Sequence, residues 1–319
     1  MKKYGILLLI VLLAGVIIFV VVSDFESSRP EQQGGNPYEY NIDEFSKVDP
    51  SLVIYRETRN IQLDKFVPRG ICYSSDKIYL ISDSLLQVIS REGVEIARYN
   101  LFDSPRCIAV SGKYIFIGFI DYIVKLDLNG ELLEKWEKLG ERTVLTSLAL
   151  KDKFLFAADA GNRKVIRYSV DGRYLGAFNG NSTGIYKHAF IIPSPCFDLA
   201  VNAENELWVV NPGLHAIENY TDDGKLRTYW ENSSINIEGF SGCCNPAQMA
   251  IFPDGTFVTA EKGLVRIKIY KPSGEFYGVV ATPGMFKEDG QAPDLAVTPA
   301  GDIYALDFDK NRIRVFQPK

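Results

Sequence analysis

Three observations in the sequence predict an all-β fold made of six repeated sheets. Aromatic residues make up 12% of the chain and suit strands. From residue 52 onward, short apolar runs alternate with turn signals such as VDG, DDG and PSG, and no segment keeps a helical period. Six segments align with one another as strand, polar turn and strand: 68–82, 105–119, 145–159, 196–210, 246–260 and 293–307. Four short antiparallel strands per about 45 residues is the size of a propeller blade, so we predict a six-bladed β-propeller.

The N-terminal residues 1–23 form a separate unit. Two lysines precede an uncharged apolar run from Gly5 to Val22, which as a helix would be about 27 Å long, enough to cross a bilayer. No small-x-small cleavage site follows the run, and no cysteine follows LLAG, which excludes a lipoprotein signal. We therefore expect a transmembrane signal anchor, with a cleaved signal peptide as the alternative. Either reading places the rest of the chain on the extracytoplasmic (periplasmic) side of the cytoplasmic membrane.

Residues 24–50 are polar and rich in Pro and Gly, which predicts a flexible linker. The propeller then occupies 51–319. Its last unit stops after a third strand, and an unassigned strand, SLVIYRET at 51–58, precedes the first unit. We expect 51–58 to supply the missing outer strand of the last blade, because this closes the ring and removes an open sheet edge.

Two segments carry a family resemblance. DAGNRKVIRYSVDGRYLGAF and GDIYALDFDKNRIRVFQ resemble NHL repeats, the blades of six-bladed NHL or TolB-like propellers. The resemblance spans the whole propeller region and implies the fold but not an activity, since such propellers include scaffolds, ligand sensors and a few metal-dependent lyases and lactonases. GFSGCCNP followed by VTAEKG is similar to a stretch of uncharacterised bacterial NHL propellers. That similarity implies a third cysteine where this chain has Ser241, which weakens a three-thiolate metal site.

Propeller topology places the polar residues. The innermost strand of each blade lines the central channel, and the loops entering it share one face, here called the top, with the loops between second and third strands. The first inner-strand positions should ring the channel mouth: Gly70, Cys107, Ser147, Asp198, Gln248 and Asp294. The ligand-binding candidates on the top face are Arg69, Arg106, Asp198, His215, Asn245, Gln248, Glu261, Lys262 and Asp294. The connections at 179–195, 231–246 and 281–293 are long, which favours a functional surface over blades four to six.

The charges at Glu261, Lys262 and Arg266 have two interpretations. We expect a solvated turn with local ion pairs. The alternative is recognition of a polar ligand beside the cysteine loop.

Three cysteines, Cys196, Cys243 and Cys244, enter neighbouring blades and leave four interpretations open. A structural disulfide could join Cys196 to Cys243 or Cys244, since thiols outside the cytoplasm tend to oxidise. The adjacent pair could be a vicinal disulfide or a redox couple, or could hold copper or zinc, which thiolates suit. The thiols could also simply be packed. Cys72 aligns with a core alanine, and the two histidines, His188 and His215, match no metal-binding spacing known to us.

These observations favour a binding function, a scaffold or sensor acting through the top face over blades four to six. The net charge of −5 argues against nucleic acid as a partner, and no phosphate loop, serine nucleophile motif or zinc-protease motif is present. The expected partners are the membrane, through the N-terminal helix, and a protein or small molecule on the top face. One alternative is a metal-dependent lyase or hydrolase, with a divalent cation held by Asp198 and Asp294 together with Gln248 or Asn245. Another is a thiol-redox or copper- or zinc-handling protein acting through Cys243 and Cys244.

Overall fold

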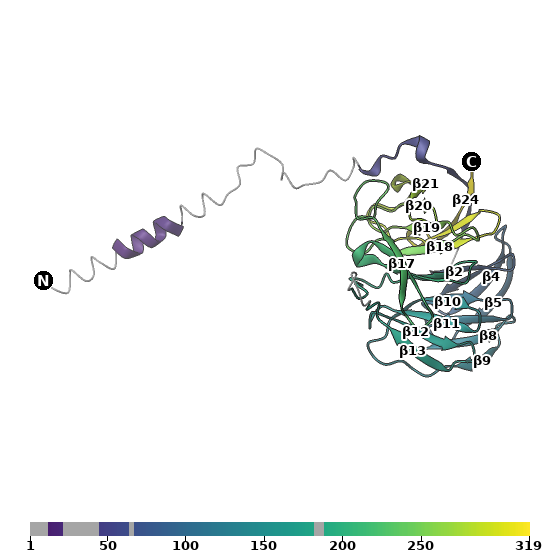
Figure 1. Cartoon of the computed structure of the whole chain (residues 1–319). Coiled ribbons are helices and arrows are strands. Elements are labelled where there is room, and N and C mark those ends of the chain that lie inside the picture. The colour runs from purple at the N-terminus through teal and green to yellow at the C-terminus, as the bar shows by residue number, and fades with distance from the viewer. Residues whose placement is uncertain (1–11, 22–44, 64–66, 182–187) are drawn as a thin grey trace. The chain divides into compact units, whose positions relative to one another are not determined.

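The computed structural model describes residues 12–21, 45–63, 67–181 and 188–319. The chain divides into two units, 1–42 and 43–319, which are treated separately. In the second unit the described residues form six four-stranded antiparallel sheets (Figure 1). Contacts between the innermost strands of neighbouring sheets run in chain order from the first to the sixth and back to the first. The sheets therefore form a closed six-bladed β-propeller.

The strands follow one another within each blade, and only the sixth blade takes one strand from elsewhere. Blades one and two consist of β2 (Pro68–Ser74), β3 (Lys77–Ser82), β4 (Leu85–Ser90), β5 (Glu95–Asn100), β6 (Cys107–Val110), β7 (Tyr114–Gly118), β8 (Ile123–Asp127) and β9 (Leu132–Lys135). Blades three and four consist of β10 (Leu145–Lys151), β11 (Phe154–Asp159), β12 (Lys164–Ser169), β13 (Tyr174–Phe178), β14 (Leu199–Val201), β15 (Leu207–Asn211), β16 (Ala216–Tyr220) and β17 (Leu226–Glu231). Blades five and six consist of β18 (Gln248–Ile251), β19 (Phe257–Ala260), β20 (Ile267–Tyr270), β21 (Phe276–Ala281), β22 (Asp294–Val297), β23 (Ile303–Asp307), β24 (Arg312–Pro318) and β1 (Tyr55–Gln62). Short 3₁₀ helices occur at η1 (Pro50–Leu52), η2 (Pro212–Leu214), η3 (Pro283–Met285) and η4 (Phe308–Lys310).

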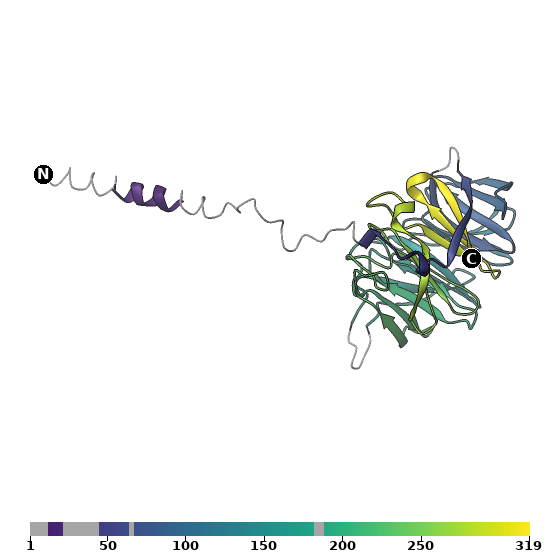
Figure 2. The ribbon, with the colours of Figure 1, turned by 90° about the horizontal axis from the view of Figure 1, so that it is seen from above.

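The ring closes by pairing β1 with β24, so that strands from the two ends of the propeller lie side by side (Figure 2). The closing strand begins and ends later than the predicted 51–58. Side chains reinforce the pairing, because Arg314 of β24 donates two hydrogen bonds to Glu57 of β1, at 2.9 and 3.1 Å. The same guanidinium donates to Asp307 at 2.9 Å.

The hydrophobic cores lie between neighbouring blades. One cluster joins Tyr79 and Leu86 of blade one to Ile115 and Val124 of blade two. Middle strands such as β15 are buried at every position, whereas the outer strand β5 has no buried residue. A middle strand is covered on both faces by adjacent blades, so its apolar run is continuous rather than alternating.

The N-terminal unit lies largely outside the described residues. Residues 12–21 are helical, and no helix among the residues that the structure describes is long and apolar enough to cross a membrane. Much of the predicted anchor, Gly5 to Val22, and most of the predicted linker, 24–50, fall outside the described ranges.

Candidate functional site

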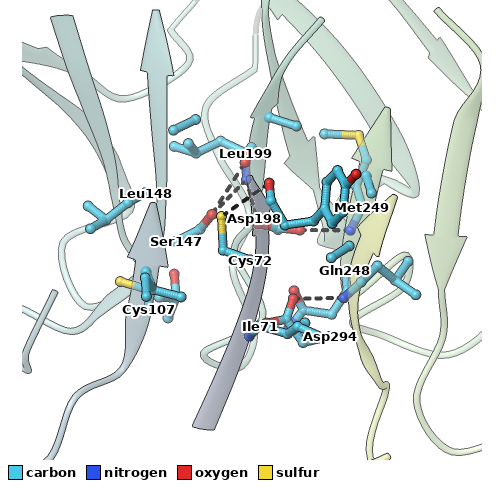
Figure 3. Close-up of a pocket in the computed structure, with 18 of the residues that line it drawn as sticks. Ile71, Cys72, Cys107, Ser147, Leu148, Asp198, Leu199, Gln248, Met249 and Asp294 are labelled. Atoms are coloured by element: carbon cyan, nitrogen blue, oxygen red, sulfur yellow. Dashed lines mark hydrogen bonds between the residues drawn. The ribbon is translucent and has the colours of Figure 1, made fainter. Parts of the chain in front are cut away.

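The inner strands enclose a channel that opens on the top face. A cavity of about 340 Å³ is lined by residues from all six blades (Figure 3). A second cavity of about 510 Å³ lies at the mouth, where residues at the start of β2, β10 and β18 line it together with top-face loop residues. The two cavities share Arg69, Arg106, Thr146 and Gln248 in their walls, so channel and mouth form one continuous site.

Two aspartates, the buried Asp198 and the half-buried Asp294, link neighbouring blades along the channel. Asp198 accepts hydrogen bonds from the backbone N–H of Leu199 at 2.8 Å and from that of Met249 in the next blade at 2.7 Å. Asp294 repeats the arrangement, accepting from Leu295 and from Ile71 of blade one, both at 2.9 Å (Figure 3). Each carboxylate thereby joins its own inner strand to the following one.

Burial controls the charge of these two groups. Desolvation raises the pKa of Asp198 to about 6, against the opposing effect of its hydrogen bonds. Desolvation, with the charge of Asp198 as the next cause, raises the pKa of Asp294 to about 7. Near neutral pH the channel therefore carries less negative charge than two ordinary aspartates would give it.

The predicted divalent-cation centre does not fit these residues. All four aspartate oxygens accept a backbone N–H, and the described part of the chain holds no group of three or more His, Cys, Asp or Glu side chains able to bind a metal ion. The carboxylates hold the inner strands in place rather than forming a ligand set. Ser147 has a similar structural role, because its hydroxyl bonds the backbone of Leu199 in the next blade.

Among the residues that the structure describes, the mouth presents one cation without an ion-pair partner. Arg69 donates to Asp83 at 2.7 and 3.0 Å. Arg106 is exposed, and its guanidinium makes no hydrogen bond or ion pair within the described residues. Amides and apolar side chains complete the wall of the mouth: Gln248, Gln291, Ile120, Phe197 and Phe308. Neither Gln291 nor Thr146 was named as a candidate from the sequence, although Gln291 belongs to the 281–293 connection that was expected on the top face.

The charges of blade five correct one expectation. Glu261 and Arg266, predicted to lie in a solvated turn, are fully buried. Arg266 donates to both oxygens of Glu261, at 3.0 and 2.7 Å, and the ammonium of Lys268, also fully buried, lies 2.8 Å from the same carboxylate. Desolvation lowers the pKa of Lys268 to about 8. The buried cations are further satisfied by carbonyls of the long 231–246 connection, which this cluster fixes against blade five.

The cysteine loop lies beside that cluster. All five cysteines are free, so the predicted disulfide from Cys196 is not formed in this structure. Cys243 is exposed and Cys244 is buried, with their sulfurs 3.2 Å apart. The ammonium of Lys262 donates to Ser194 at 3.1 Å. Ser194 was not expected to take part, because it lies in a different long connection.

The remaining candidates belong to this loop or to the core. His215 shares a hydrogen bond of 2.8 Å between Nδ1 and the Asn245 carbonyl. His188 lies 3.5 Å from the buried Glu218. The described walls of the channel and mouth do not include four of the predicted ligand-binding residues: Asn245, His215, Glu261 and Lys262. Cys72, expected in the core, is half-buried and lies in the channel wall (Figure 3).

Comparison with known proteins supports the fold alone. No family model matches the chain, and no curated protein matches it. A streptogramin B lyase structure aligns with a TM-score of 0.60 at 12% identity, covering 85% of this chain and 100% of that one. Virginiamycin B lyase from Staphylococcus aureus aligns at 0.55 with 15% identity, covering 83% and 89%, and the WD40 propeller domain of Doa1 aligns at 0.54 with 11% identity, covering 83% and 97%. The NHL assignment has no support from a family match, and the similarity shows a six-bladed β-propeller.

Proposed function

We propose that this protein is a binding module, a sensor or scaffold, whose top face takes a small anionic ligand at the channel mouth. The observation that carries the proposal is Arg106, an exposed guanidinium without a partner among the described residues, at the rim of a cavity of about 510 Å³. Ligand pockets commonly have volumes of about 300–1,000 Å³ and combine apolar walls with a few polar groups. Guanidinium groups bind carboxylates and phosphates through paired hydrogen bonds.

The other groups of the mouth support the same ligand class. Gln248 and Gln291 supply amide donors, while Phe197 and Phe308 supply apolar contact area. The aspartates deeper in the channel oppose an anion weakly, because burial raises the pKa of both carboxyls. The mouth is formed by all six blades, so the proposed surface extends the predicted one over blades four to six to include the arginines of blades one and two.

A lyase function is the weaker candidate. Three of the similar structures are lyases, and one of these is a catalytically inactive histidine-to-alanine variant of virginiamycin B lyase with quinupristin. In this chain neither histidine lies in the described walls of the channel or mouth, since His188 contacts Glu218 and His215 contacts Asn245. The walls therefore favour binding over a reaction that uses a histidine there.

The test is a binding screen of the full-length chain against carboxylates, phosphates and sulfonates, by thermal shift and then calorimetry. Losing a hydrogen bond to a charged group costs about 1.5–3 kcal/mol, so we expect Arg106→Gln to weaken the best ligand about 10- to 100-fold. Arg173→Gln, which changes an exposed arginine in the turn before β13, should bind like the wild type. Equal affinity in Arg106→Gln, or no anion binding at millimolar concentration, would contradict the proposal.

We also propose that residues 1–23 anchor the propeller on the extracytoplasmic side of the cytoplasmic membrane. The support is the apolar run Gly5 to Val22 behind two lysines. The full chain should remain in the membrane fraction after carbonate washing, and a chain lacking 1–23 should not. Recovery of the full chain in the washed supernatant would contradict the anchor.

A further inference from the structure

The cysteine loop forms a site of its own, separate from the channel mouth. Cys243 is exposed, whereas Cys244 is only 1% exposed, and the two sulfurs are 3.2 Å apart. One thiol is thus presented to solvent while a second lies directly behind it.

Hydrogen bonds hold the loop in position on both sides. Asn245, almost fully buried, accepts from the Lys262 N–H at 2.9 Å and donates to the Lys262 and Ser241 carbonyls at 3.2 and 2.6 Å. The main-chain carbonyl of Asn245 is fixed by His215. The turn that carries both cysteines is therefore attached to blade five and blade four, which keeps the two sulfurs together.

The surroundings give the two thiols different acidities. Burial alone would raise the pKa of Cys244, but hydrogen bonds from Ser194, Cys243 and Lys262 outweigh it and lower that pKa. The hydrogen bond to Cys244 is the main cause that raises the pKa of Cys243. Cys244 is therefore the more acidic of the two thiols, and the Lys262 ammonium favours its thiolate form.

We propose that Cys243 and Cys244 form a thiol–disulfide exchange site, in which Cys243 attacks the disulfide of a thiol compound or protein and Cys244 resolves the mixed disulfide. A disulfide between adjacent cysteines is strained, and strained disulfides are easily reduced. This property suits a reversible exchange site better than a structural crosslink. Lys262 is a positioning residue, because it acts on the partner disulfide through the two thiols, chiefly Cys244.

The exchange is balanced with a disulfide RSSR as the oxidant. Cys243 passes its proton to the Cys244 thiolate and attacks one sulfur of RSSR, which forms a Cys243–SR bond and releases RS⁻. Cys244 then gives its proton to RS⁻ and attacks the Cys243 sulfur, which forms the Cys243–Cys244 bond and releases a second RS⁻ that takes a proton from water. The protein loses two electrons and RSSR gains two.

The test uses reduced full-length protein and glutathione disulfide, followed by intact mass and peptide mapping. Wild type should lose two hydrogen atoms without a lasting adduct, and Cys244→Ser should retain glutathione on Cys243. Cys243→Ser should react at least about tenfold more slowly, since its remaining thiol is buried. Cys196→Ser is the matched control and should behave as wild type. Cys72 should not compete, because burial raises its pKa to about 12.

The variant Lys262→Met tests the electrostatic role of Lys262 through the pH dependence of the reaction, which a purely structural role would not change. With both cysteines present, it should shift the pH dependence of oxidation of the pair to higher pH, and in the Cys244→Ser background it should leave the identity of the adduct unchanged. Rapid labelling of Cys243→Ser, or a Cys196 crosslink as the main oxidised product of wild type, would overturn the proposal. Stoichiometric zinc or copper on the pair that blocks oxidation would also overturn it, in favour of a metal site.

Discussion

The buried charge cluster of blade five gives the sharpest stability prediction, through the change Glu261→Gln. Glu261 accepts two hydrogen bonds from Arg266 and lies 2.8 Å from the Lys268 ammonium. The three side chains are at most 1% exposed. The substitution keeps the shape of the side chain but removes the negative charge between two buried cations, and turns an amide N–H₂ towards one of the donors.

The expected loss follows from the environment of these groups. Breaking a buried ion pair by removing one partner costs about 3–5 kcal/mol. Lys268 can relieve part of this by losing its proton, since its pKa is already lowered to about 8 and each pKa unit corresponds to about 1.4 kcal/mol. We therefore expect Glu261→Gln to lower the free energy of unfolding by about 3 kcal/mol at pH 7, and by less at pH 9.

Urea unfolding followed by tryptophan fluorescence is the assay, because Trp230 packs against Tyr270 next to the cluster. The matched control is Glu275→Gln, which breaks an exposed ion pair of 2.7 Å with Lys271 in the same blade and should cost less than about 1 kcal/mol. Equal losses in the two variants would refute the reasoning. So would a Glu261→Gln defect that grows between pH 7 and pH 9.

Two further predictions concern ring closure and the channel. A chain that begins at residue 63 lacks β1, which leaves the edge of β24 unpaired, so we expect it to aggregate in a light-scattering assay. A chain that begins at residue 45 keeps β1 and should have the melting temperature of the full chain. Equal behaviour of the two shortened chains would contradict closure of the ring by β1. Asp294, with its pKa raised from 3.8 to about 7, holds its proton more tightly in the folded state than in the unfolded state, so its contribution to stability is complete below pH 4 and is lost as the pH rises towards 7. The free energy of unfolding of Asp294→Asn should therefore rise relative to that of wild type between pH 4 and pH 7, by at most about 4 kcal/mol. This value is an upper limit because part of the Asp294 side chain remains exposed. A difference in urea unfolding free energy that stays constant over this pH range would contradict the assigned pKa.

The blades themselves were predictable from the sequence. Strand alternation, turn residues and the repeated unit depend on near neighbours in the chain, and the same short pattern recurs in all six segments, from 68–82 to 293–307. The residues at the start of the inner strands, such as Arg106, Asp198 and Asp294, could likewise be assigned to the channel, because position within a blade fixes position in the ring.

Burial and partnership were decided by the tertiary structure. Glu261 and Arg266 occupy a turn, where charges are usually solvated, but the 231–246 connection lies over them and supplies carbonyl acceptors from distant positions in the chain. The sequence by itself placed Cys243 and Cys244 in a loop, whereas the fold brought Ser194 and Lys262 to them and buried one of the two sulfurs. Local pattern determines which elements form, but the acidity and accessibility of a group depend on side chains that only the folded ring brings together.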